Sequence, residues 1–198
     1  MKIVKQGWTW HILPMPYKEM VLYIAGSARN CYRSEQKSFE EEEKFIKNLI
    51  KRGHHSPLEH VNLSLKITTD RGVLAELTRH RLSSFSVEST RYVKYKEVTY
   101  VLPVWSSKYN LENNWKIICQ KNEQDYLGML LFGATPQEAR QVLNMSLKTD
   151  IVMTSNIRQW RTVLKQRTAK DAHPQMIALM TSILDNFKKE FPVFFEDL

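Results

Sequence analysis

The strictest alternation of apolar and polar residues lies in residues 61–69, VNLSLKITT. Its apolar side chains all fall on one side of an extended chain: Val61, Leu63, Leu65 and Ile67. Successive side chains of a strand point to opposite faces, so this segment is predicted to be a half-buried strand. Residues 2–13 and 92–102 alternate less regularly, which predicts two further strands that end at Pro14 and Pro103.

Residues 38–53, SFEEEEKFIKNLIKRG, carry the clearest signals of a helix. Ser38 and Glu41 fit a capping box, and Gly53 suits the position after the last turn. The apolar residues expected to face the core are Phe45, Leu49 and Ile50. The glutamate run, residues 40–43, is expected to be a solvated helix start that interacts favourably with the helix dipole rather than a metal site.

Further helices are expected from apolar spacing at residues 17–29, 73–81, 111–132, 155–167 and 174–189, with Val73, Leu74 and Leu77 inward in the second. In the first of them Met20, Tyr23 and Ile24 share a face, and residues 70–72 before the second are interpreted as a turn. An N-cap threonine, a proline and an acid predict one more helix, which starts at Pro136 and carries Arg140.

No repeat, linker or change of composition divides the 198 residues, and this length fits a single domain, residues 1–198, with its own core. The predicted fold class is α+β, an antiparallel sheet packed with several helices. No segment approaches the roughly 20 consecutive apolar residues of a membrane span. No apolar run follows Lys2 and Lys5, so we expect no secretory signal and a cytoplasmic location.

Net charge indicates the class of partner that this protein binds, and cysteine spacing indicates which sites it can form. Lysine and arginine total 29 against 21 acids, a net charge of +8, and the isoelectric point is near 9.4. This excess favours an anionic partner, which includes nucleic acids, nucleotides and acidic metabolites. Cys31 and Cys119 have no metal-ligand spacing, so a disulfide framework or zinc site is not expected. Each thiol is interpreted as a buried inert side chain or as a catalytic group.

A first polar patch, residues 53–60, reads GHHSPLEH and directly precedes the strand at 61–69. It holds three of the six histidines. A metal site, a turn that lines a ligand pocket and a plain surface turn are all compatible with this spacing.

A second patch, residues 79–91, reads RHRLSSFSVESTR and combines arginines with hydroxyl side chains. Glu76, Arg79 and His80 are spaced to share one helix face. Forked guanidinium donors, hydroxyls and free backbone N–H groups form anion sites, so this patch is either an anion-binding loop or a solvated one.

A third patch is the predicted helix around residues 155–167, which carries Arg158, Arg161 and Arg167 after Asn156. A basic helix is commonly a solvated face, and it can also lie in a nucleic-acid groove.

Three motifs in order resemble one family, the flavin-dependent thymidylate synthases. Residues 79–89 match its RHR triplet followed by seven residues and a serine, and GHHSPLEH resembles its GHxSPxEH segment. Downstream, PQEARQVL with Arg140 and TSNIRQW…LKQR also fit, so the resemblance runs from about Ala25 to Gln175.

The resemblance implies an enzyme that converts dUMP to dTMP without a nucleophilic cysteine. In this family FAD is reduced by NADPH, methylenetetrahydrofolate donates the one-carbon unit, and the flavin supplies the hydride. The family assembles as a homotetramer whose active sites are shared between subunits. The same assembly is therefore expected here, with no membrane partner and with nucleic acid unlikely as a ligand.

The resemblance also carries over site residues. It implies that Arg167 is catalytic, because it polarises the uracil ring. The residues implied to bind dUMP are Glu76, Arg79, Ser86, Val87, Glu88, Ser89, Thr90, Arg91, Arg140 and Arg167. Those implied to contact FAD or folate are His54, Ser56, Glu59, Arg79, His80, Arg81, Asn156, Arg158 and Thr162. No metal is implied.

Some members of the family carry other residues at four of these positions. They have Gln at position 76, Asn-Glu at positions 86 and 87 and Asn at position 162, where this chain has Glu76, Ser86, Val87 and Thr162. A carboxylate at position 76 would repel phosphate unless Arg79 or a similar partner neutralised it. A carboxylate that faces the pyrimidine could accept from an exocyclic amine, so dCMP is an alternative substrate. A basic nucleic-acid-binding module is the alternative from another class.

Overall fold

A computed structural model describes residues 1–198, except the side chain of Tyr32. In chain order the elements are β1 (Lys2–Val4), β2 (Gly7–Trp10), α1 (Tyr17–Tyr32), α2 (Phe39–Lys51), the 3-10 helix η1 (Ser56–His60), β3 (Asn62–Asp70), α3 (Arg71–Leu77), β4 (Ser84–Val87), β5 (Thr99–Val101), α4 (Glu112–Leu131), α5 (Pro136–Ala139), the 3-10 helix η2 (Arg140–Val142), β6 (Lys148–Asn156), α6 (Ile157–Arg167), α7 (Pro174–Glu190) and α8 (Pro192–Phe195).

The main sheet has four strands in the order β2-β3-β6-β4, and every neighbouring pair is antiparallel. The long central pair β3 and β6 aligns Leu65 with Met153 and Ile67 with Ile151 on the buried face. The α+β class and the antiparallel sheet are therefore confirmed. A second sheet pairs β1 with β5 in parallel.

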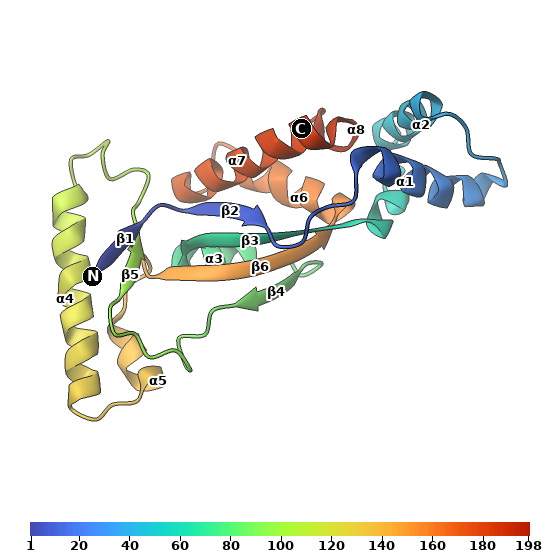
Figure 1. Cartoon of the computed structure of the whole chain (residues 1–198). Coiled ribbons are helices and arrows are strands. Elements are labelled where there is room, and N and C mark those ends of the chain that lie inside the picture. Colours follow the sequence, from blue (N-terminus) through green and yellow to red (C-terminus); the bar gives the residue numbers. More distant parts are fainter.

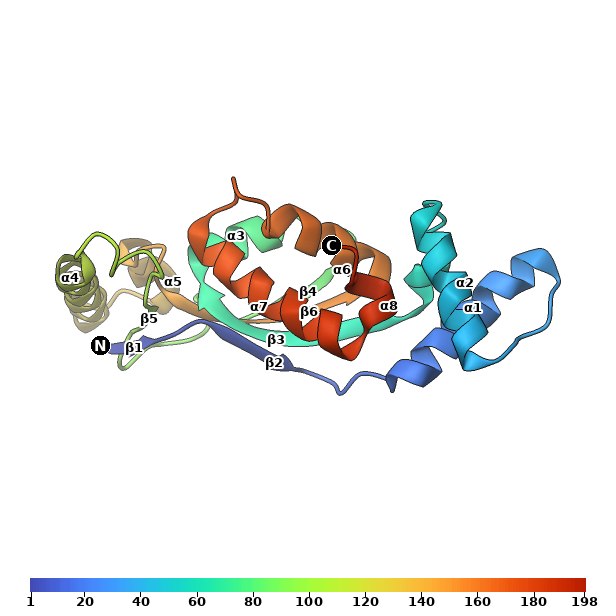
Figure 2. The same cartoon turned by 90° about the horizontal axis from the view of Figure 1, so that it is seen from above.

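The helices are distributed unevenly around the main sheet. Figures 1 and 2 show α3, α6 and α7 on one face, the α1–α2 hairpin beyond one end and α4 with α5 beyond the other. In both views no helix of the described chain covers the opposite face. That face carries polar pairs, among them Thr68, which donates to Asp150 at 2.6 Å. No helix of the described residues is both long and apolar enough to cross a bilayer.

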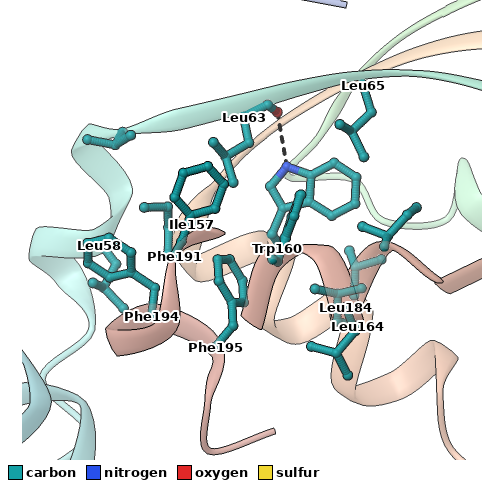
Figure 3. Close-up of a cluster of buried hydrophobic side chains, with 14 of the residues drawn as sticks. Leu58, Leu63, Leu65, Ile157, Trp160, Leu164, Leu184, Phe191, Phe194 and Phe195 are labelled. Atoms are coloured by element: carbon teal, nitrogen blue, oxygen red, sulfur yellow. Dashed lines mark hydrogen bonds between the residues drawn. The ribbon is translucent and has the colours of Figure 1, made fainter. Parts of the chain in front are cut away.

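The main core lies between the sheet and the helices on its covered face (Figure 3). Trp160 of α6 is fully buried there, and its indole N–H donates to the Leu63 carbonyl at 3.0 Å. Figure 3 shows this hydrogen bond crossing from α6 to β3. A smaller cluster around Tyr100, Trp115 and Tyr126 joins β5 to α4. The main core extends from the sheet to α1 and α2, and the smaller cluster holds α4 at the other end of the molecule.

Several predictions from the sequence are confirmed. The four alternating apolar residues at 61–67 are all buried, and β3 begins one residue after the first of them. Ser38 and Glu41 form the capping box of α2, and Gly53 after it has φ of +76°. α4, α6 and α7 lie where apolar spacing predicted helices.

Other predictions are wrong. The strand predicted at residues 2–13 is two short strands in different sheets, and only Thr99–Val101 of residues 92–102 forms a strand. The segment 70–72 is not a turn, because Asp70 caps α3 with its carboxylate, which accepts from the Val73 N–H at 2.8 Å. β4 and β6 were not predicted at all.

Burial also corrects the sequence reading of α1 and α2. Tyr23 is exposed although Met20 and Ile24 on the same helix are buried. The glutamate run is not wholly solvated, since Glu42 is 0% exposed and accepts from Arg29 Nε at 2.7 and 2.9 Å. The carboxylate of Glu42 therefore joins α2 to α1 instead of facing water.

Candidate active site

Arg167, the last residue of α6, contacts two residues at and beyond the end of α3. Its Nε donates to His80 Nε2 at 2.9 Å, its Nη1 to the Glu76 carboxylate at 2.9 Å, and its Nη2 to the Glu76 carbonyl at 3.0 Å. The exposed fraction of the side chain is 19% for Arg167 and 34% for Glu76. These three residues, the Arg167 cluster, form a half-buried charged group on the covered face of the sheet.

His80 is neutral in this arrangement. Burial lowers its pKa, and the Arg167 guanidinium lowers it further. Because Nε2 accepts from Arg167, the ring proton lies on Nδ1. The side chain is a hydrogen-bond acceptor that holds the guanidinium.

The sequence predicted that Glu76, Arg79 and His80 would share a helix face, and this is wrong because only Glu76 lies on the helix. α3 ends at Leu77, so positions 79 and 80 follow the helix. His80 is 7% exposed, whereas Arg79 is exposed. Within the described chain, neither Arg79 nor the equally exposed Arg81 has a side-chain hydrogen bond or ion pair, so Glu76 is neutralised by Arg167 instead.

A second group is formed by residues 89–91, which follow β4, and by residues 137 and 140, which precede β6. Arg140 Nη1 donates to Thr90 Oγ1 at 3.0 Å, and Arg91 Nε donates to the Gln137 side chain at 3.0 Å. The Ser89 hydroxyl accepts from the Arg91 backbone N–H at 3.2 Å. Among the described residues, no carboxylate pairs with either arginine. This Arg91–Arg140 cluster is therefore an unneutralised cationic site with two hydroxyls.

Glu88 anchors the start of that loop. Its carboxylate accepts from the Tyr95 hydroxyl and from Lys148 Nζ, both at 2.8 Å, while Arg71 Nη2 donates to its backbone carbonyl at 2.8 Å. Lys148 also bridges to Asp150 at 2.6 Å. Desolvation and the Glu88 hydrogen bond raise the pKa of Tyr95, so its hydroxyl stays protonated. Sequence reasoning missed Arg71, Tyr95 and Lys148, since their spacing carries no motif.

Ser86 and Val87 belong to β4, which pairs with β6 opposite Val152 and Ile151. Ser86 is exposed and Val87 is half-buried. With Glu88 they line a shallow hollow of about 290 Å³ at the sheet edge. These predicted site residues thus lie on a strand and not in a loop.

A third group joins the GHHSPLEH segment to the start of α6. Arg158 Nη1 pairs with the Glu59 carboxylate at 2.5 Å. The Asn156 side chain caps α6 by accepting from the Gln159 N–H at 2.8 Å, and Thr162 donates to the Arg158 carbonyl at 3.3 Å.

An open hollow of about 520 Å³ lies beside this third group. It is lined by His55, Arg158, Arg161, Thr162, Lys165, Thr168, Asp197 and Leu198. The predicted residues His54 and Ser56 are exposed on the same segment. The described residues contain no group of three histidine, cysteine or carboxylate side chains placed to bind a metal.

The three groups remain separate within one chain. No hydrogen bond or ion pair of the described residues joins one group to another. Arg158 and Arg167 lie nine positions apart on α6, about 14 Å along its axis at 1.5 Å per residue. Most of the predicted site residues are therefore brought into three clusters and not into one closed pocket, while Arg79 and Arg81 are exposed outside all three.

Comparison with known proteins identifies the chain. The model of the family described as thymidylate synthase complementing protein matches residues 17–193. The flavin-dependent thymidylate synthase of Clostridium tetani is 29% identical, over 87% of this chain and 80% of the relative. The probable flavin-dependent thymidylate synthase of Mycobacterium phage L5 is 30% identical, over 87% and 78%, and that of Corynebacterium aurimucosum is 27% identical, over 97% and 85%. The chain therefore belongs to the thymidylate synthase complementing protein family, the flavin-dependent thymidylate synthases.

Proposed function

We propose that this protein catalyses the reductive methylation of dUMP to dTMP, with methylenetetrahydrofolate as carbon donor and NADPH-reduced FAD as hydride source. The observation that carries the proposal beyond family membership is the Arg91–Arg140 cluster, two guanidiniums beside Ser89 and Thr90 with no acid partner in the described chain. Unpaired guanidiniums next to hydroxyls favour a phosphate ester. A nucleoside monophosphate matches this chemistry.

In this proposal the nucleotide spans two clusters. The residues proposed to bind it are Glu76, Arg79, Ser86, Val87, Glu88, Ser89, Thr90, Arg91, Arg140 and Arg167. The phosphate occupies the Arg91–Arg140 cluster, and the pyrimidine faces Arg167.

Arg167 is the proposed catalytic residue. A guanidinium keeps its proton at any physiological pH, so it can stabilise negative charge on a pyrimidine carbonyl without transferring a proton. Cys119 is not a candidate nucleophile, because it is buried and burial raises its pKa. A route that needs no protein thiol is consistent with these two residues.

The third group fits a cofactor that contains a diphosphate. Arg158, Lys165 and His55 line one open hollow, and two hydroxyls stand beside them. The residues proposed to hold FAD and folate are His54, Ser56, Glu59, Arg79, His80, Arg81, Asn156, Arg158 and Thr162. When bound, FAD would supply hydride-transfer chemistry between NADPH and the one-carbon unit.

We also propose a homotetramer with shared active sites. The separation of the three clusters supports it, because one chain does not bring them together. Exposed apolar side chains at the end of α4 support it as well, since Leu131 is 84% and Phe132 is 92% exposed. Two variants, Arg140→Ala and Arg167→Ala, test sharing at a dUMP concentration well below the raised KM of Arg140→Ala, where each variant alone has little activity. Mixed and refolded together, they should regain activity if one site takes these arginines from different chains, and stay inactive if one chain supplies both.

The test of the function begins with the visible spectrum of the purified protein. Oxidised flavin absorbs near roughly 450 nm. Anaerobic NADPH oxidation that requires dUMP, with dTMP as product, would support the proposal. If flavin reduction required dCMP and not dUMP, the proposed substrate would be dCMP instead of dUMP. A colourless protein that takes up no FAD and binds duplex DNA or RNA with steep salt dependence would replace the enzyme by a nucleic-acid-binding module.

The Arg167→Ala variant tests the catalytic assignment. Methylation should be abolished while FAD content stays near that of the wild type, because the proposed cofactor residues are unchanged. Turnover equal to the wild type would remove the proposed role of Arg167. Ser89→Ala is the matched control, and we expect only a weaker nucleotide affinity, since no covalent serine intermediate is proposed.

A further inference from the structure

The Arg167 guanidinium is unusually constrained for a residue at the end of a helix. It has five N–H donors, and three of them are engaged by His80 and Glu76. The engaged donors are on all three nitrogens, so one N–H remains on each terminal nitrogen. Two N–H donors of the guanidinium are therefore free of partners in the described chain, and the contacts on the other three N–H groups set their directions.

Glu76 makes two of the three contacts. Its backbone carbonyl would remain after any substitution, but its carboxylate is the only group that holds Nη1. His80 holds Nε and is neutral. Removing the carboxylate would leave Nη1 without a partner in the described chain, so only His80 and the Glu76 carbonyl would still restrain the guanidinium.

The same carboxylate changes the charge that the site presents. Arg167 with Glu76 is a neutral pair, while Arg91 and Arg140 carry two charges without an acid. A phosphate dianion is attracted more strongly to unneutralised guanidiniums, and a neutral carbonyl needs directed donors rather than net charge. This difference in net charge assigns the phosphate of a nucleotide to Arg91 and Arg140 and its base to Arg167.

We propose that Glu76 is a positioning residue that aims the free N–H donors of Arg167 at the pyrimidine and, by neutralising the guanidinium, keeps phosphate away from that position. This inference rests on the proposed function. It moves Glu76 from direct contact with the nucleotide to a role exerted through Arg167. The two terminal N–H groups then meet a carbonyl edge of the base, where charge develops during the reaction.

Glu76→Ala and Glu76→Gln separate orientation from other effects. The amide oxygen of glutamine can still accept from Nη1, while alanine cannot. We expect Glu76→Ala to lower kcat by roughly 10- to 100-fold, the effect of a small misplacement of a catalytic group, with little change in KM for dUMP. Glu76→Gln should recover most of the kcat. Both variants should keep the wild-type far-UV circular dichroism and FAD content, because Glu76 is partly exposed and outside the core.

Three results would overturn the proposal: a wild-type kcat in Glu76→Ala, an equal loss of kcat in both variants, or a loss that appears only as a higher KM. A readout independent of activity is the Nε–H resonance of Arg167 in ¹⁵N-labelled protein, assigned by its loss in Arg167→Lys. It should be sharp in the wild type and in Glu76→Gln and broadened in Glu76→Ala. An inactive wild type would refute the proposed function, and this resonance would then decide the role of Glu76 alone.

Discussion

The hydrogen bond between Trp160 and Leu63 offers a direct test of how α6 is attached to the sheet. The Trp160→Phe substitution removes the indole N–H donor, whose bond to the carbonyl is 3.0 Å long, and part of a ring that is fully buried. α6 carries both Arg158 and Arg167, so this attachment also supports two of the three clusters. Figure 3 shows apolar side chains of the core around the ring, among them Leu65 and Leu164.

The expected cost has two parts. A net intramolecular hydrogen bond contributes about 1 kcal/mol. The lost ring atoms correspond to roughly two methylene groups at about 0.8 kcal/mol each, and the cavity that they leave adds to this. The free energy of unfolding should therefore fall by about 2–4 kcal/mol, a large share of the 5–15 kcal/mol typical of a domain.

Urea unfolding followed by far-UV circular dichroism at one fixed protein concentration would measure this cost. With an m-value of about 2–3 kcal/mol/M, the midpoint should fall by about 1 M. Trp8→Phe is the matched control, because Trp8 loses the same atoms at a partly exposed site where its N–H donates to Ser182. If Trp160→Phe lowered the midpoint no more than Trp8→Phe, the Leu63 bond would not anchor α6.

Three further predictions concern the buried ion pair of Arg29 and Glu42, the neutral side chain of His80 and the Arg91–Arg140 cluster. Glu42→Ala should destabilise the protein by about 3–5 kcal/mol in the same urea assay, because it strands the Arg29 charge, whereas the exposed control Glu40→Ala should change little. Burial and then the neighbouring guanidinium lower the pKa of His80, so its stabilising contribution is complete above the unfolded value of about 6.5 and is lost as pH falls below it. The urea midpoint should then drop more steeply between pH 7.5 and 5 in the wild type than in His80→Gln, and parallel curves would contradict this. Arg140→Ala should raise KM for dUMP by roughly 10- to 100-fold, the effect of losing one hydrogen bond to a charged group. Arg140→Lys should raise KM less. An unchanged KM would contradict the proposal that the phosphate binds at Arg140.

Local patterns predicted the elements whose signals are complete within a few residues. The strict alternation of β3 and the capping box of α2 were found because each signal is complete within one short segment of the sequence. The central strand β6 was missed, since Thr149 and Ser155 occupy buried positions and hide the alternation. Its central place in the sheet comes from pairing with β3 and β4 on either side, which no local pattern contains.

The candidate active site shows the same division between local signals and contacts of distant segments. Residue types and spacing in RHRLSSFSVESTR and GHHSPLEH were sufficient to identify the family by resemblance, and through it they predicted an arginine-rich nucleotide site. They did not show that Glu76 would pair with Arg167 and not with Arg79, three positions away.

The sequence by itself determined the elements whose signals are local, such as α2 and β3, and the motifs that identify the family, because propensity, capping and amphipathic spacing are local. Only the tertiary structure decided which charges meet. Glu76 and Arg167 are separated by 91 positions, and the packing of α6 on β3 through Trp160 brings the end of one helix to the end of another. Pairing across such a distance depends on how buried surfaces fit together, and that fit is a property of the whole core.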